Sequence, residues 1–123
     1  EDDLMLAGSV TDLQRMFINI FENANRYGRD PLSRHLRLSV SCKLAENDLR
    51  YGIRIQIRDH GTGVPQASIE AILRPFTRVN EARSQANGAG LGLAIVDRIT
   101  KRHGGLIKLA NHPKGGLLIR LDF

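Results

Sequence analysis

The stretch IRIQIRDHGTG at residues 53–63 decides the fold. Isoleucine occupies every second position of its first half and polar residues stand between, which is the period of a strand with one buried face. Residues 36–44 have the same period and predict a second strand of this kind. The apolar positions of residues 36–44 are Leu36, Leu38, Val40, Cys42 and Leu44. Because Asn47 and Asp48 mark a turn between the two stretches, we expect them to pair as a hairpin.

Asp59 stands at the end of the second strand, and the alternation places its side chain on the buried face. A carboxylate that faces a core needs hydrogen-bond donors. Gly61 and Gly63 let the backbone turn sharply and approach a flat ligand. The carboxylate would therefore suit an amino group such as the exocyclic amine of adenine. The alternative, simpler for this residue alone, is an Asx turn in which Asp59 accepts from its own backbone.

Residues 11–28 predict the first helix. Thr11 is the expected N-cap, with Gln14 completing a capping box, and Gly28 is the expected end. Apolar residues follow at helical spacing. They are Leu13, Met16, Phe17, Ile20, Phe21 and Ala24.

Polar residues of this helix gather on one flank of the apolar face. Asn19 and Asn23 lie one turn apart, so their amide oxygens can converge on a cation. Such ligands suit Mg²⁺ when phosphates and waters complete the shell. Arg26, a turn further, can hold a phosphate, whereas Glu22 points away from this flank. The alternative is a solvated helix edge, which accounts for Asn19 more simply than for Asn23, because an amide beside the core needs partners.

A second group of glycines, GAGLGL at residues 88–93, lies at the start of a helix predicted from Leu91 to His103. Open backbone N–H groups and the helix dipole favour an anion there, so a phosphate cradle is one interpretation and a flexible hinge is the other. The segment lacks the preceding strand of a Rossmann motif and the Gly-Lys-Ser/Thr of a P-loop.

The remaining elements complete an α+β domain. Residues 65–73 predict a short helix that begins with proline, and residues 79–90 predict a long polar loop. Residues 106–109 and 117–123 predict a final hairpin. The order of helices and strands indicates a mostly antiparallel sheet with helices stacked on one face.

The composition fits one globular domain over residues 1–123. The net charge is +5, and no stretch reaches the ~20 apolar residues that span a bilayer. The single cysteine, Cys42, excludes an internal disulfide and is expected to be a small core residue. Tryptophan is absent, and Arg26, Arg29, Arg34 and Arg37 form no one-faced stripe, so we expect no nucleic-acid partner. The histidines, at His35, His60, His103 and His112, show no metal-ligand spacing.

Four short motifs occur in the order of a known family. NIFENANRY at 19–27 resembles the N box of the GHKL ATP-binding domains, and DHGTG at 59–63 resembles their G1 box. RPFTR at 74–78 resembles the F box, and GAGLGL at 88–93 resembles the G2 box. The chain is most similar to the catalytic ATP-binding (HATPase_c) domain of bacterial sensor histidine kinases, of the osmosensor EnvZ type. This resemblance implies the Bergerat fold, an α/β sandwich with a mixed, mostly antiparallel sheet and about three helices on one face.

The resemblance also implies a role for each residue at a matching position. The adenine would lie against Asp59, Gly61, Gly63 and Tyr27. The phosphates would lie against Arg26, Gly88, Gly90, Leu91 and Gly92. Asn19 and Asn23 would hold Mg²⁺ together with the ATP phosphates, and Arg78 and Asn87 would belong to a mobile lid around residues 79–90.

Three positions depart from the patterns of the family. The ATPase relatives (gyrase, Hsp90, MutL) carry Glu where this chain has Asn19, and an amide cannot act as a general base. The resemblance therefore implies a kinase that spares ATP from hydrolysis and passes on its γ-phosphoryl group. Ala89 stands where the family often has Thr or Ser, and Leu73 stands where the F box often has Phe.

The resemblance implies partners beyond ATP. The phosphoryl acceptor would be a histidine on the protein's own dimerisation domain, and a response regulator would then take the group. None of the four histidines has the sequence context of that acceptor, so we expect an excised catalytic domain that does not phosphorylate itself. We expect it to be a monomer in isolation, and to be the cytoplasmic domain of an inner-membrane protein that is a homodimer at full length. The alternatives are a GHKL ATPase, a serine kinase of the anti-sigma type, and a non-catalytic nucleotide-binding regulatory module.

Overall fold

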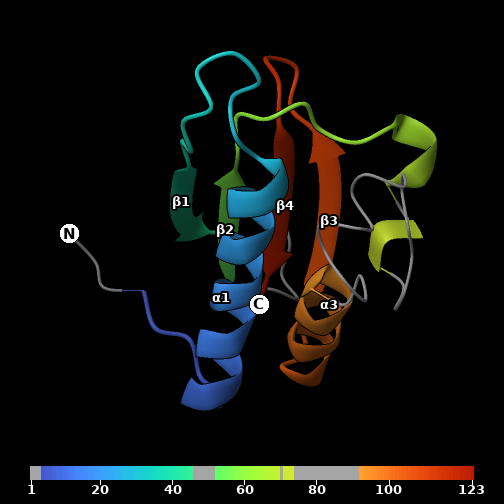
Figure 1. Ribbon diagram of the computed structural model, residues 1–123. Helices are drawn as coiled ribbons and strands as arrows, with labels where there is room; N and C mark the ends of the chain where they lie inside the picture. Colours follow the sequence, from blue (N-terminus) through green and yellow to red (C-terminus); the bar gives the residue numbers. More distant parts are fainter. Residues whose placement is uncertain (1–3, 46–51, 70, 74–91) are drawn as a thin grey trace.

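The computed structural model describes residues 4–45, 52–69, 71–73 and 92–123 (Figure 1). The strands are β1 (Ser39–Leu44), β2 (Ile53–Arg58), β3 (Leu106–Asn111) and β4 (Leu117–Asp122). The helices are α1 (Val10–Tyr27), α3 (Gly92–Arg102) and the short 3₁₀ turns η1 (Gln66–Ser68) and η2 (Ala71–Leu73). The predicted loop over 79–90, together with Arg78, Asn87, Gly88, Gly90 and Leu91, lies outside the described residues.

The strands form one sheet in the order β1-β2-β4-β3, and α1 and α3 lie side by side on one face of it (Figure 1). The predicted α+β class and both predicted hairpins are confirmed. Each pairing in the described part of the sheet is antiparallel, which agrees with the prediction of a mostly antiparallel sheet. The short helix predicted over 65–73 is instead two separate 3₁₀ turns.

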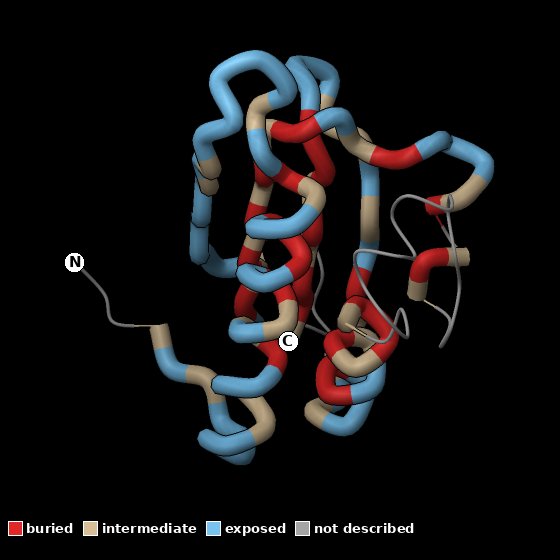
Figure 2. The backbone as a smooth tube through the Cα atoms, in the orientation of Figure 1, coloured by how far each residue is buried: buried red, intermediate tan, exposed pale blue. Residues whose placement is uncertain are grey.

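The core lies between the helix layer and the sheet (Figure 2). Alternate residues of β2 and β4 are buried against the helices, as the period of two predicts. From the helix side the core receives Met16, Ile20, Val96 and Ile99, all nearly inaccessible to solvent. Burying side chains of this size stabilises the fold by about 1.5–3 kcal/mol each.

The first helix begins earlier than the sequence predicts. Ser9, not Thr11, is the N-cap, because its hydroxyl accepts from the backbone N–H of Asp12. This satisfies one of the N–H groups that the first turn leaves without a helical partner. Gly28 ends the helix as predicted, and its N–H donates to the carbonyl of Ala24 at 2.7 Å.

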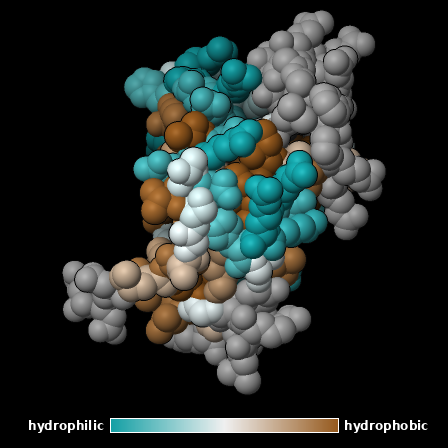
Figure 3. All heavy atoms as spheres, turned by 90° about the horizontal axis from the view of Figure 1, so that it is seen from below, coloured by the Kyte–Doolittle hydropathy of each residue, from teal (hydrophilic) through white to brown (hydrophobic). Residues whose placement is uncertain are grey.

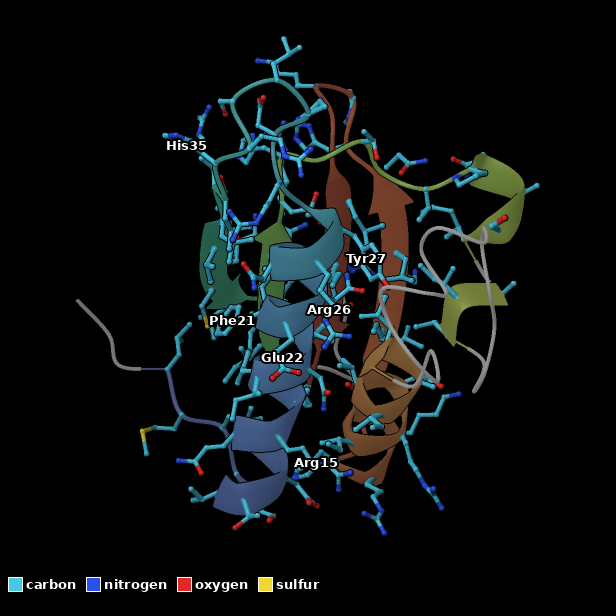
Figure 4. All side chains as sticks on the ribbon, in the orientation of Figure 1. Arg15, Phe21, Glu22, Arg26, Tyr27 and His35 are labelled. Carbon is cyan, nitrogen blue, oxygen red and sulfur yellow. The ribbon has the colours of Figure 1, made fainter. Side chains whose placement is uncertain are left out.

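The apolar stripe predicted to be buried in the first strand is exposed instead. Val40 and Leu44 are 58% and 57% exposed, and Cys42 is exposed rather than part of the core. Their register against β2 turns them toward the helix side of the sheet, but β1 is the edge strand and lies to one side of α1 (Figure 1). Phe21, predicted to be buried, is also 41% exposed on the β1 side of α1 (Figure 4). The strand begins at Ser39 rather than Leu36.

Polar contacts join α1 to the end of α3 where α1 begins. The imidazole Nε2 of His103 accepts from the N–H of Ser9 at 3.1 Å, and a guanidinium nitrogen of Arg102 lies 4.0 Å from the Asp12 carboxylate. Figure 3 views this end and shows hydrophobic residues gathered beside the N-terminal segment. Neither α1 nor α3 is long and apolar enough to cross a membrane, nor is any other helix in the described ranges.

Candidate functional site

Asp59 follows β2 directly and its side chain is buried, with 7% of its surface exposed. One carboxylate oxygen, Oδ1, accepts from the N–H of Gly61 at 3.1 Å and from the N–H of Leu117 at 3.0 Å. The Asx-turn interpretation is therefore correct for this oxygen. No described residue donates to the second oxygen, Oδ2. The carboxylate is held in place by one oxygen and keeps the other as an acceptor.

Three glycines let the backbone close around this carboxylate. A Cβ on Gly28 would lie 2.7 Å from Asp59 Oδ2, and a Cβ on Gly61 would lie 2.6 Å from the carbonyl oxygen of Tyr27. Gly116 has a φ of +89°, and a Cβ there would overlap the carbonyl oxygen of Asp59. Gly28, at the end of α1, and Gly116, just before β4, therefore pack directly against the turn that follows β2. Gly28 was expected only to end a helix, and the sequence carries no signal that Gly116 meets Asp59.

Gly63 lies in the left-handed region, with a φ of +74°. A Cβ there would lie 2.5 Å from the side-chain oxygen of Asn111. The Asn111 amide binds both backbone groups of Val64, accepting from its N–H at 2.9 Å and donating to its carbonyl at 2.6 Å. Sequence reasoning missed Asn111, because a polar residue at the end of a strand is common and its partner is 47 residues away.

The polar flank of α1 lies where the helical wheel places it. Asn23 is buried, with 9% exposure, and Asn19 is half-buried. Asn19 donates its amide N–H to the Arg15 carbonyl at 2.9 Å, and no described residue donates to its amide oxygen. Arg26 and Tyr27 leave α1 on the side toward α3 and β3 (Figure 4).

The start of α3 lies beside this flank. The Thr100 hydroxyl contacts Met16 Sδ at 3.5 Å, and α1 and α3 run in opposite directions, since the start of α1 meets the end of α3. At about 1.5 Å per residue, Asn23 lies about 10 Å along α1 from Met16, and Gly92 lies about 12 Å along α3 from Thr100. Because the helices are antiparallel, the step from Met16 to Asn23 and the step from Thr100 to Gly92 run in the same direction. Gly92 and Asn23 therefore lie at the same height along the helix pair.

The site thus combines three elements at one end of the sandwich: a buried carboxylate, a flank of amides and a helix N-terminus. Among the described residues, a Cβ on Gly92 would have no neighbour within 4 Å. In the described part of the chain, no group of three or more His, Cys, Asp or Glu side chains could hold a metal ion. Of the residues predicted to contact phosphates, only Arg26 and Gly92 fall within the described ranges.

This arrangement is that of the GHKL-type nucleotide-binding sandwich, and comparison with known proteins places the chain in that class. Residues 8–123 match the HATPase_c family, "Histidine kinase-, DNA gyrase B-, and HSP90-like ATPase", and the chain belongs to this family.

The similar proteins are sensor histidine kinases. The chain is 37% identical over 113 residues to sensor histidine kinase CpxA of Escherichia coli K12, covering 91% of this chain and 22% of CpxA. It is 31% identical over 121 residues to sensor histidine kinase component HK1 of Mycobacterium tuberculosis H37Rv, covering 98% of this chain and 66% of HK1. The chain therefore spans about a fifth of CpxA and about two thirds of HK1.

The fold matches that of a solved catalytic domain. The nucleotide-free catalytic domain of histidine kinase ThkA superimposes with a TM-score of 0.76 at 22% identity. The match covers 100% of this chain and 72% of that one. The predicted HATPase_c domain of the sensor histidine kinase type is thus confirmed. The finer prediction of an EnvZ-type osmosensor stays a prediction.

Proposed function

We propose that this chain is the ATP-binding catalytic domain of a two-component sensor histidine kinase. It binds ATP with Mg²⁺ and donates the γ-phosphoryl group to a histidine on the dimerisation domain of the same protein, from which a response regulator takes it. The observation that carries the proposal is the half-satisfied carboxylate of Asp59. Backbone N–H groups occupy Oδ1, and Oδ2 remains for a donor on the ligand.

This carboxylate selects adenine by the direction of one hydrogen bond. The exocyclic amine of adenine donates, whereas guanine presents an oxygen at the same place and would meet a second acceptor. A Cβ on Gly28 or Gly61 would meet protein atoms of this turn, so the two glycines keep the end of α1 packed closely against Asp59 and hold its carboxylate in place. Tyr27, half-buried at the end of α1, would flank the base.

The phosphates would extend from the base toward the start of α3. The positive end of the α3 dipole, at Gly92, favours an anion there. The amide oxygens of Asn19 and Asn23 would complete the shell of a Mg²⁺ ion held mainly by phosphate oxygens and water. Arg26 would neutralise further phosphate charge.

Asn19 decides between transfer and hydrolysis. An amide has no useful basicity, so the site positions ATP without activating a water. In the proposed transfer, a nitrogen of the acceptor imidazole forms a bond to the γ-phosphorus as the bond to the bridging oxygen of ADP breaks. Phosphoryl transfer depends mainly on positioning and charge neutralisation, which this site can supply. Hydrolysis by a GHKL ATPase is not favoured.

Calorimetric titration of the domain with ATP and Mg²⁺ tests the proposal. Asp59→Asn is nearly isosteric and keeps an oxygen for the two backbone donors, but its amide nitrogen would face the adenine amine. We expect it to weaken ATP binding about a hundredfold, since a charged hydrogen bond is replaced by an unpaired donor. GTP is the matched ligand and should bind the wild type weakly.

The transfer step is tested by mixing the domain with a purified histidine-bearing dimerisation domain and γ-labelled ATP. Label on the partner's histidine would support the kinase proposal. The absence of binding at millimolar ATP, or steady-state hydrolysis of ATP by this domain alone, would refute it.

A further inference from the structure

The sheet face opposite the helices is basic. Because β2 and β4 bury alternate residues against the helices, the residues between them point to the open face. Pairing register adds residues of β1 and β3 to the same face. The charged residues on it are Lys43, Arg54, Arg58, Lys108, Arg120 and Asp122. The single carboxylate among them, Asp122, is buried and engaged by both Arg54 and Arg120 at 2.9 and 3.0 Å.

Positive charge gathers at one corner of this face, where the charge of Arg37 also acts on Asp30. Arg58 donates its Nε–H to the Gly115 carbonyl at 3.1 Å, and no described carboxylate lies within ion-pair distance of Arg58, Arg37 or Lys114. Partial desolvation, followed by the charge of Arg58, lowers the pKa of both His60 and His112 below the ordinary imidazole value. The field at this corner therefore favours an anion.

The corner holds a cavity of about 320 Å³ that opens beside β1. It is lined by five residues with polar side chains and by two apolar residues, which are Ser39, Ser41, Gln56, Arg58, His112, Val40 and Leu118. Ser39 Oγ lies 3.3 Å from His60 Nε2, which joins that imidazole to the rim. Donors of this kind suit a carboxylate, and Arg can bind one through two hydrogen bonds.

The neighbouring strand offers a backbone edge. β1 is the terminal strand of the described sheet, and all six of its residues are exposed. Its outer edge presents backbone N–H and C=O groups to which an extended segment can add as a further strand. Alternate side chains of such a segment would lie over the open face, next to Arg37, Ser39, Ser41 and Lys43.

The same face lacks what nucleic acids and membranes need. Among the described residues, its strand positions carry no aromatic side chain on which a base could stack. The exposed apolar residues of β1, Val40 and Leu44, turn to the other side of the sheet, and the leucines of this face, Leu106 and Leu118, are only partly exposed, so the face offers little apolar surface to a bilayer.

We infer that the open face beside β1 docks an acidic, extended protein segment, which adds a strand to β1 and places a glutamate carboxylate against Arg58. A strand added to β1 would lie about 10 Å from β2, so the longer side chain of glutamate is better suited than that of aspartate to meet the Arg58 guanidinium over β1. This inference does not depend on the proposed nucleotide function, since the side chain of Asp59 turns to the helix side and that of Arg58 to the open face.

The test uses a capped peptide of alternating Thr and Glu, whose glutamates share one face when extended, and its Gln-for-Glu counterpart. We expect the acidic peptide to bind at least about tenfold more tightly than the Gln peptide and to lose affinity as salt is raised. NMR amide shifts should change along Ser39–Leu44. Binding of the Gln peptide with equal affinity, or amide shifts confined to other elements, would overturn the inference.

Arg58→Gln should weaken acidic-peptide binding about tenfold, whereas the matched variant Arg98→Gln removes an exposed charge on α3 and should bind as the wild type does. Arg58→Lys, which keeps the charge, should recover part of the loss. Both Gln variants should bind ATP equally, so failure of docking and failure of the nucleotide site are separable. A single-stranded oligonucleotide or phosphatidylglycerol vesicles that bind this face more tightly than the peptide at equal salt would refute the inference.

Discussion

Two hydrogen bonds join Asp59 and Leu117, one between backbone groups and one to the Asp59 carboxylate. The N–H of Asp59 donates to the Leu117 carbonyl at 3.1 Å, and the N–H of Leu117 donates to the Asp59 carboxylate at 3.0 Å. The backbone pairing of β2 with β4 is thus continued by a carboxylate. The residue proposed to select the base is also the residue that closes the sheet around the site.

This dual role predicts different costs for two substitutions of Asp59. Asp59→Ala leaves the N–H groups of Gly61 and Leu117 without their acceptor, and each unsatisfied buried donor costs about 1–3 kcal/mol. Asp59→Asn keeps an oxygen for both and should cost under about 1 kcal/mol. Denaturant unfolding followed by circular dichroism measures both. Equal losses of stability in the two variants would contradict the role given to Oδ1.

Two glycines with positive φ allow the cost of backbone strain to be measured separately from the cost of steric overlap. Gly116 and Gly104 have φ values of +89° and +73°, but only at Gly116 does an added Cβ meet other atoms. Gly104→Ala should cost about 1–2 kcal/mol from backbone strain alone. Gly116→Ala should cost clearly more, because the Asp59 turn must move to admit a methyl group. The unfolding midpoints of the two variants measure the difference. Similar midpoints would show that the turn at Asp59 moves at little cost in free energy.

The amide flank of α1 predicts a magnesium-dependent loss. Asn19→Ala and Asn23→Ala should each weaken binding of ATP in the presence of Mg²⁺ about tenfold, because an amide ligand of the cation is removed. With Mg²⁺ removed by EDTA, the wild type and both variants should bind ATP with similar, weaker affinity. Gln14→Ala, at an exposed position of the same helix, is the control. A deficit that persists in EDTA would point to a different role for these amides.

The two histidines of the basic corner predict how stability depends on pH. Partial desolvation and the charge of Arg58 lower the pKa of His60 and His112 in the folded state, so the folded protein binds these protons more weakly than the unfolded chain. Their contribution to stability is present above the ordinary value of about 6.5 and is lost as the pH falls below it. Denaturant unfolding across this range should show the decline, and the double variant His60→Gln, His112→Gln should reduce it. Added salt should also reduce it, because it screens Arg58.

Periodicity predicted the elements that local chemistry controls. The alternation over Ile53–Arg58 identified β2 and the inward direction of Asp59, and helical spacing placed Asn19 and Asn23 on one flank of α1. These patterns depend only on the geometry of a strand or a helix, so they can be recognised in the sequence without knowledge of the fold. The N-cap was misplaced by two residues, since Ser9 and Thr11 are both acceptable caps and the choice depends on where the chain enters the helix.

Periodicity failed for β1 because it reports which residues share a face, not whether anything covers that face. Val40, Cys42 and Leu44 do share the helix side of the sheet, but β1 is the edge strand and α1 does not cover it. Burial is decided by the neighbour across the layer, which a single strand's sequence does not contain.

The sequence by itself determined the family, the inward carboxylate at the end of β2 and the polar flank of α1, because these follow from residue type at short spacing. Only the tertiary structure decided that Gly28 and Gly116 enclose Asp59, that Asn111 anchors the backbone after Gly63, and that the start of α3 is level with Asn23. Each of these joins residues far apart along the chain. Their approach is determined by how the helices pack on the sheet, which no local pattern encodes.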